Sequence, residues 1–237
     1  MGVISFLYRI KNRYKFVWKL LYPIRYVYAR IYNNAVNRQM RKNLHASGID
    51  VLTFFKDCLD KQGIKFWLTS GTLLGAWREK SFIGHDMDID VCVFAEHRDE
   101  AKKILQENGF ELLHEYGVVG SGVKEHAYEL NGVKIDVFYV EKEEDKFSVY
   151  VFFKEKAEQT DFNVIKILYP ETGFVPYSFM NGEFLIPEKT IEYLVANYGE
   201  NFMIPDKNWK YTKDIPSAIY YPLSEKQGFT VSYENNQ

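Results

Sequence analysis

The sequence predicts an α+β fold, in which a mixed β-sheet is flanked by helices and preceded by a basic, amphipathic helical arm. Three observations lead to this prediction. Helical and strand patterns alternate through the middle of the chain, and an Asn-Gly pair joins two strand patterns as in an antiparallel hairpin. The first 49 residues hold ten Lys or Arg and no Asp or Glu. The 237 residues suffice for one domain with an appendage.

The amino-terminal arm, residues 1–45, combines basic charge with an apolar helical face. On a helix over residues 5–22 that face holds Phe6, Leu7, Ile10, Tyr14, Val17, Trp18 and Leu21, and the basic residues lie outside it. This pattern is typical of a helix on an anionic membrane surface, and Pro23 is expected to break or kink it. No stretch reaches the roughly 18 apolar residues of a membrane span, and no secretory signal pattern is present.

Three roles for the arm stay open at this point. The first is contact of residues 1–42 with a membrane surface, and the second is packing on the body or on a second subunit. The third is binding to nucleic acid, because basic charge attracts any polyanion. The membrane is favoured, and no nucleic-acid partner is expected. The rest of the chain is acidic, with 20 Lys or Arg against 32 Asp or Glu.

The body is expected to form one domain over residues 46–215, followed by a carboxy-terminal tail over residues 216–237. In the first half of the domain the patterns predict a helix over 47–62, a strand over 64–68, a turn over 69–72, a helix from Leu73, a strand over 87–94 and a helix over 98–108. Next, Asn131-Gly132 joins strands over 123–130 and 133–140. The pattern beyond Ser148 is less regular until a helix from Pro187 to about Tyr198. The tail is expected to wrap over the surface.

The cysteines and histidines exclude two classes of site. Cys58 and Cys92 have no CxxC spacing, so neither a disulfide framework nor a structural zinc site is expected, and a reducing compartment is the default. None of the five histidines has the HxxxH or HxxE spacing of a zinc centre.

The most informative segment is His85-Asp86-Met87-Asp88-Ile89-Asp90. On a strand over 87–94, alternation places Asp88 and Asp90 on one face, with Asp86 in line just ahead of them. Asp is a poor strand former, and like charges this close repel each other unless a cation or a proton intervenes. A divalent cation removes the conflict, and Mg²⁺ combines a few carboxylates with phosphate oxygens. The segment therefore predicts a metal site for phosphoryl or nucleotidyl transfer.

Two alternatives to this metal site fit the sequence less well. An EF-hand calcium loop shares the 1, 3, 5 spacing of the aspartates, but Val91 stands where that loop requires Gly and His97 where it requires Glu. A solvated strand edge with incidental acids is the other alternative, and the strongly apolar residues between the aspartates speak against it.

Two further features add to the aspartate strand. Asp136 is a lone acid in a β-branched and aromatic strand, where an unpaired charge is costly, so a shared metal site is its expected partner. Ser70-Gly71-Thr72 joins a strand to a helix, and backbone N–H groups at a helix start can hold phosphate.

Taken together, the segments Trp67 to Arg78 and Ser81 to Asp90 resemble the LicD/fukutin family. The resemblance lies in a Gly-Thr-Leu-Leu-Gly-Ala turn, an Arg and an Asp-x-Asp-Ile-Asp strand, and it extends to the later strand with Asp136 and to Tyr198-Gly199. It covers residues 64–209 and leaves the arm outside. Gly84-His85 stands where members often have Pro-Trp, Met87 where an additional Asp is frequent, and Phe202 or Met203 where a Trp is common.

The resemblance implies a nucleotidyltransferase fold and an enzyme that transfers phosphocholine or a polyol phosphate from a CDP-linked donor onto a glycan or lipid-linked glycan. It implies Mg²⁺ or Mn²⁺ as the cofactor, held by Asp88, Asp90 and Asp136, with Asp86 as support or a further ligand. Asp136 would complete the metal site or take the acceptor proton. Ser70, Gly71 and Thr72 would position phosphate, Arg78 would neutralise developing charge, and His85 would contact phosphate or support the site.

Two other functions stay open. A nucleotidyltransferase that adds a nucleoside monophosphate to protein, RNA or a small molecule would use the same carboxylates. A glycan-binding module without catalysis has little reason to hold four aspartates in apolar strands. A bacterial, cytoplasmic protein on the inner face of the membrane is expected from the arm and from the absence of signal and disulfide patterns.

Overall fold

The computed structural model describes residues 22–156 and 158–233. In this part of the chain the helices are α3 (Tyr22–Asp60), α4 (Ser70–Arg78), α5 (Arg98–Glu107) and α6 (Thr190–Tyr198). The strands of the large sheet are β1 (Phe66–Leu68), β2 (Asp88–Phe94), β3 (Glu111–Val118), β4 (Gly122–Leu130), β5 (Val133–Glu143), β6 (Lys146–Phe153), β7 (Asn163–Pro170), β10 (Ala218–Tyr221) and β11 (Gly228–Ser232). A separate hairpin consists of β8 (Phe174–Phe179) and β9 (Gly182–Pro187).

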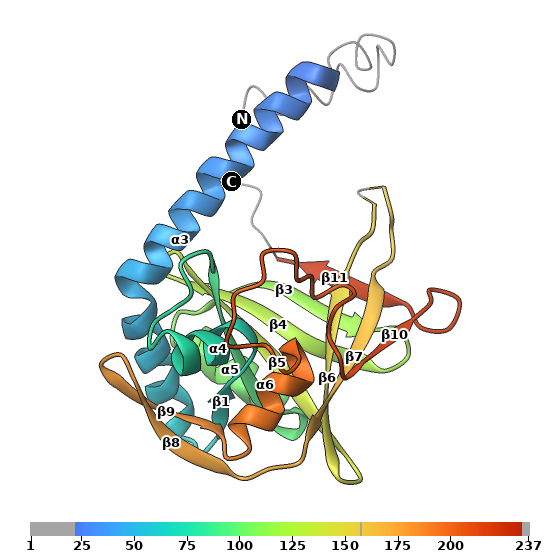
Figure 1. Ribbon diagram of the computed structural model, residues 1–237. Helices are drawn as coiled ribbons and strands as arrows, with labels where there is room; N and C mark the ends of the chain where they lie inside the picture. Colours follow the sequence, from blue (N-terminus) through green and yellow to red (C-terminus); the bar gives the residue numbers. More distant parts are fainter. Residues whose placement is uncertain (1–21, 157, 234–237) are drawn as a thin grey trace.

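Strand β5 organises the sheet. The antiparallel path runs β10-β7-β6-β5-β4-β3-β11, and β2 joins β5 in parallel, with β1 beyond it. The two strands β2 and β6 follow one another along the same edge of β5, because β2 pairs with residues 134–140 and β6 with residues 141–143. The sheet is therefore mixed and curled, as Figure 1 shows. An α+β fold with a mixed sheet is confirmed.

The helices cover the two faces of the β2–β5 pair. Helices α3 and α5 pack over the face of Ile89, Val91, Ile135 and Val137, all of them fully buried. Helices α4 and α6 pack over the opposite face, which carries the aspartates. A sheet between helices on both sides keeps β2 and β5 rigid along their length, and this fixes the spacing of the polar groups that they carry.

Helix α3 is 39 residues long and runs without a break across residues 45 and 46. The expected helix over 47–62 is its carboxy-terminal part, where Leu44, Leu52, Phe55 and Leu59 are fully buried. Its amino-terminal part projects away from the sheet in Figure 1, and most of residues 30–42 are exposed. The amphipathic pattern predicted over residues 5–22 lies almost entirely outside the described residues.

The predicted hairpin is confirmed, with β4 and β5 antiparallel around Asn131-Gly132. Both turn residues have positive φ, 53° and 74°, as a tight turn between twisted strands requires. The tail expected over residues 216–237 contributes two strands to the sheet, because β10 pairs with β7 and β11 pairs with β3 at its two edges. Both strands are short, and their partners lie far away in sequence, so local patterns did not reveal them.

A buried polar group lies on the α5 side of the sheet, apart from the aspartates. His126 is 1% exposed, and its Nδ1 lies 2.9 Å from the Tyr128 hydroxyl and 2.8 Å from the Tyr139 hydroxyl. Its Nε2 lies 3.1 Å from Glu115 Oε1, without hydrogen-bond geometry. Burial lowers the pKa of His126 to about 4, although the Glu115 carboxylate acts in the opposite direction.

This depressed pKa predicts that His126 contributes a loss of stability in acid. Below about pH 6.5 the unfolded chain binds a proton at this histidine that the folded chain takes up only near pH 4, so the unfolding free energy falls across that window. We expect His126 to contribute a loss of about 2 kcal/mol between pH 7 and pH 5. Urea unfolding at pH 7 and at pH 5 measures this change in the unfolding free energy. His126→Gln should remove this loss, whereas the exposed His45→Gln should keep it; equal pH dependence in the two variants contradicts the assignment.

Candidate active site

Strand β2 presents its aspartates as alternation predicts. Ile89, Val91 and Val93 are fully buried on one face, and Asp88 and Asp90 lie partly exposed on the other. Asp86 sits just before the strand, held by a hydrogen bond from its backbone N–H to the Ile83 carbonyl. The three carboxylates therefore follow one another along a single edge of the sheet.

Strand β5 brings Asp136 next to them. The parallel register pairs Asp90 with Asp136 and Asp88 with Lys134. Paired residues on adjacent strands share a face and lie about 5 Å apart. The structure thus brings Asp136 to Asp88 and Asp90, from which it is 48 and 46 residues away along the chain, and the three were expected to meet.

The start of α4 contacts this group through Asp90. The Gly71 N–H donates to Asp90 Oδ2 over 3.0 Å, and the Asp90 N–H donates to the Thr72 hydroxyl over 2.8 Å. Thr72 is buried and so positions the strand, whereas Ser70 begins the helix with a positive φ of 45°. A Cβ on Gly71 would lie 3.1 Å from Asp86 Oδ2 and 3.2 Å from Asp90 Oδ2, so only glycine leaves this space free.

Two charged residues of the site escaped sequence analysis. The Lys134 ammonium lies 2.7 Å from Asp136 Oδ2 and 3.8 Å from Asp88 Oδ2, so it is the ion-pair partner of both aspartates. Glu125 lies on β4 beside this group, nearly buried at 8% exposure. A signal existed for Lys134, which is two residues from Asp136 and so shares its face on a strand. Glu125 gave no such signal, because it stands between Lys124 and His126.

Burial and mutual repulsion raise the pKa values of aspartates in this cluster. Burial, followed by the charge of Asp88, raises the pKa of Asp86 to about 7, and burial, followed by the charge of Asp136, raises the pKa of Asp88 to about 6. Burial and its three aspartate neighbours hold the pKa of Asp90 well above its usual range. Burial opposes the charge of Lys134, but Asp136 and Asp88 outweigh it and raise the pKa of that ammonium. The site has an excess of negative charge.

These residues fit a hard divalent cation. Carboxylates from two adjacent strands share one edge, and Asp136 Oδ1 is buried with no hydrogen-bond partner among the described residues. The fit requires side-chain adjustment, because in the described part of the chain no three His, Cys, Asp or Glu side chains are already grouped as a metal site. Lys134 supplies the positive charge that Asp88 and Asp136 contact.

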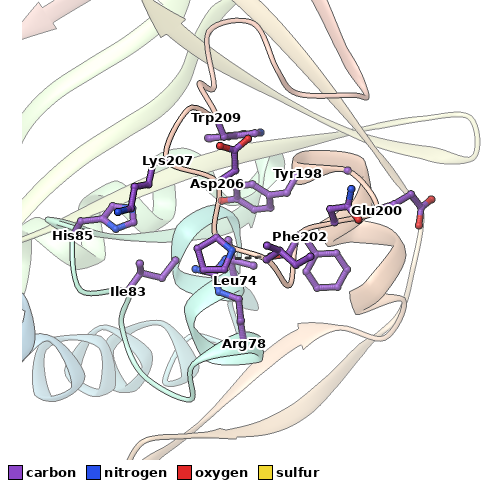
Figure 2. A pocket seen from close by; sticks show the side chains of 14 residues that line it. Leu74, Arg78, Ile83, His85, Tyr198, Glu200, Phe202, Asp206, Lys207 and Trp209 are labelled. Atoms are coloured by element: carbon purple, nitrogen blue, oxygen red, sulfur yellow. Dashed lines mark hydrogen bonds between the residues drawn. The ribbon is translucent and has the colours of Figure 1, made fainter.

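A pocket of about 1010 Å³ (Figure 2) reaches the residue next to Asp86, because His85 is one of its lining residues. One wall comes from α4 and the loop before β2, with Leu74, Arg78, Ile83 and His85, and the other comes from residues 198–209 after α6. Arg78 Nη1 donates to the Phe202 carbonyl over 3.1 Å and pairs with Glu79, so it joins the two walls. His85 is exposed at the rim, with Nε2 3.9 Å from Asp86 Oδ1. Arg78 and His85 thus face this pocket, while Ser70, Gly71 and Thr72 lie at the aspartates.

The sequence of this chain matches one domain family over more than half its length. Residues 63–189 match the family described as LicD/FKTN/FKRP, nucleotidyltransferase domain. The chain is 28% identical over 183 residues to "Ribitol-5-phosphate transferase FKTN" of Homo sapiens, covering 76% of this chain and 39% of that protein. It is 30% identical over 195 residues to "Uncharacterized protein RP689" of Rickettsia prowazekii (strain Madrid E), covering 77% and 63%. The chain thus spans about two fifths of the length of the human relative.

Solved structures resemble the chain only distantly. The lincosamide antibiotic adenylyltransferase LnuA, lincomycin-bound, has a TM-score of 0.39 at 13% identity and covers 58% of this chain and 78% of its own. A likeness at this level carries no argument about fold or function.

The fold and the acidic strand pair define a nucleotidyltransferase-type domain. The chain belongs to the LicD/FKTN/FKRP family. The predicted resemblance to the LicD/fukutin family is therefore confirmed. The family match ends at residue 189, before the pocket wall formed by residues 198–209.

Proposed function

We propose that the protein transfers a substituted phosphate, a polyol phosphate or phosphocholine, from a CDP-linked donor onto a surface glycan or a lipid-linked glycan. One observation carries the proposal: in a chain of this family, the register pairs Asp90 with Asp136 beside the start of α4. The name of the human relative, a ribitol-5-phosphate transferase, supports a polyol phosphate as the transferred group.

The proposed chemistry is displacement at the phosphorus atom that bears the substituent. An acceptor hydroxyl oxygen forms a bond to that phosphorus, the bond to the bridging oxygen breaks, and CMP leaves with the bonding electron pair. Asp136 is the proposed acceptor of the hydroxyl proton, because its Oδ1 has no hydrogen-bond partner among the described residues. Lys134 places positive charge at the same edge, where it favours negative charge on phosphate oxygens.

A divalent cation, Mg²⁺ or Mn²⁺, is part of the proposal. Asp88, Asp90 and Asp136 would hold it, with Asp86 next in line, and it would neutralise the diphosphate as a Lewis acid. The Gly71 N–H orients Asp90, and Thr72 anchors the strand behind it. Ser70 is proposed to contact phosphate at the helix start, and Arg78 and His85 are proposed to contact the donor from the pocket.

A donor screen tests the function. The full chain is incubated with CDP-ribitol, CDP-glycerol or CDP-choline, Mg²⁺ and a glycan acceptor, and the nucleotide product is measured. We expect CMP release with at least one donor. Pyrophosphate release from a nucleoside triphosphate, with no CMP from any CDP-linked donor, would instead favour the nucleotidyltransferase alternative.

We also propose that residues 1–42 place the enzyme on the inner face of a bacterial membrane, where lipid-linked acceptors are built. Exposed Arg30, Arg38, Arg41 and Lys42 on α3 support this, since basic residues bind anionic headgroups. Among the described residues no helix is long and apolar enough to cross a bilayer. Pelleting with anionic liposomes should be lost when residues 1–42 are deleted, and undiminished pelleting would count against this location.

A further inference from the structure

The pocket beside the aspartates has an apolar floor and a polar rim. Leu74, Ile83 and Phe202 form the floor, and all three are buried. The lining side chains of His85, Glu200, Asn201, Asp206 and Lys207 are polar and exposed at the rim, whereas the Arg78 side chain is half-buried. A ligand that fills the pocket therefore needs a flat, weakly polar part for the floor and a polar part for the rim.

Two aromatic rings complete the inner surface. Tyr198 and Trp209 have ring centroids 4.8 Å apart at an angle of 46°, and Figure 2 shows both rings on the side of the pocket formed after α6. The indole Nε1–H of Trp209 is buried and has no hydrogen-bond partner among the described residues. Buried donors are rarely left unpaired, so this group points to a ligand oxygen or nitrogen atom that accepts from it.

The pocket borders the aspartate cluster at His85 and Tyr198, which both line it. Burial, followed by the charges of Asp90, Tyr169 and Asp86, raises the pKa of the Tyr198 hydroxyl. His85 joins the rim to Asp86 from the other side. A ligand in the pocket can therefore extend its charged end directly to the residues proposed to hold the diphosphate.

We propose that this pocket binds the nucleoside of the donor, with its base against Trp209 and Tyr198 and its ribose toward the rim. A base matches the apolar floor and the aromatic rings, and its carbonyl or ring nitrogen can accept from Trp209 Nε1–H. A sugar ring matches less well, because its hydroxyls need polar partners at depth, where the buried lining is Leu74, Ile83 and Phe202. This inference rests on the proposed function, in which the donor carries a nucleoside.

The test is nucleotide binding, which needs no turnover. Calorimetry in Mg²⁺ gives the Kd of CDP, UDP, ADP and inorganic pyrophosphate for the wild-type chain and for Trp209→Ala. We expect Trp209→Ala to raise the Kd of the nucleotide that binds the wild type by about 10- to 100-fold, and to leave the Kd of pyrophosphate unchanged. Trp209→Phe keeps a ring without the N–H, so a loss of about two- to tenfold is expected. Met203→Ala is the matched control, since Met203 lies in the same segment, is 51% exposed and does not line the pocket.

Equal nucleotide affinity in the wild type and Trp209→Ala overturns the inference. A parallel loss of pyrophosphate binding also overturns it, because the effect would then not be specific to the base. The two proposals fail separately. If ADP binds in place of CDP and its binding depends on Trp209, the nucleoside pocket is supported and the CDP-linked donor is contradicted. If transfer from a CDP-linked donor is unaffected by Trp209→Ala, the CDP-linked donor is supported and the nucleoside pocket is contradicted.

Discussion

Replacing Asp90 with asparagine is expected to lower kcat/KM for transfer by about a thousandfold or more, because a charged ligand of the proposed cation is lost. The fold should not suffer. Asn keeps an oxygen that can accept from the Gly71 N–H, now 3.0 Å from the carboxylate. It also removes a desolvated charge that faces Asp88, Asp136 and Asp86. Without divalent metal, the unfolding free energy should therefore rise by about 1 kcal/mol.

Steady-state kinetics and urea unfolding in EDTA measure the two effects on the same protein. Asp57→Asn is the matched control, because Asp57 lies exposed on α3, and both quantities should stay at their wild-type values. A structural role would give a different pattern. If Asp90→Asn retains a tenth of the activity, or unfolds at lower urea than the wild type, Asp90 is not a catalytic carboxylate.

The second large effect is expected from Gly71→Ala, which tests the role of the free space between helix α4 and the aspartates. The added Cβ would meet Asp86 Oδ2 at 3.1 Å and Asp90 Oδ2 at 3.2 Å, so both carboxylates must shift by a few tenths of an ångström. Small displacements of catalytic groups are costly, and we expect kcat/KM to fall about a hundredfold. Stability should stay within about 1 kcal/mol, since alanine is favoured over glycine in a helix and Gly71 lies in the first turn of α4.

The control for this variant is Gly84→Ala, in the loop before the aspartates. A Cβ at Gly84 meets nothing within 4 Å, so wild-type activity is expected. Equal activity of Gly71→Ala and the wild type would mean that the free space at Gly71 has no role in catalysis.

Local sequence was sufficient for the central part of the site. Strict alternation over Asp88 to Val93 predicted which side chains share a face, and Asn131-Gly132 predicted the hairpin that carries Asp136. Both patterns extend over only a few residues, so they do not predict which strand pairs with β2. That pairing decides whether Asp136 lies next to Asp90. The expectation that the two would meet came from the cost of an unpaired charge at Asp136, and the family resemblance agreed with it.

Long-range pairing explains what the sequence did not reveal. Asp136 was expected to have only a metal as its partner, whereas the parallel register places Lys134 between Asp136 and Asp88. The pocket likewise depends on residues 198–209 returning to α4, where the Phe202 carbonyl accepts from Arg78. No periodicity marks that return, because the segment is an irregular loop held by tertiary contacts.

The most direct test of the central claim is the metal dependence of transfer. CMP release from the active CDP-linked donor is measured with the wild-type chain, first in EDTA and then during titration with Mg²⁺ or Mn²⁺. The carboxylates of β2 and β5 predict no release in EDTA and full recovery with the divalent cation, and the recovery should be absent in Asp90→Asn. Undiminished CMP release in EDTA would contradict a metal site at Asp88, Asp90 and Asp136.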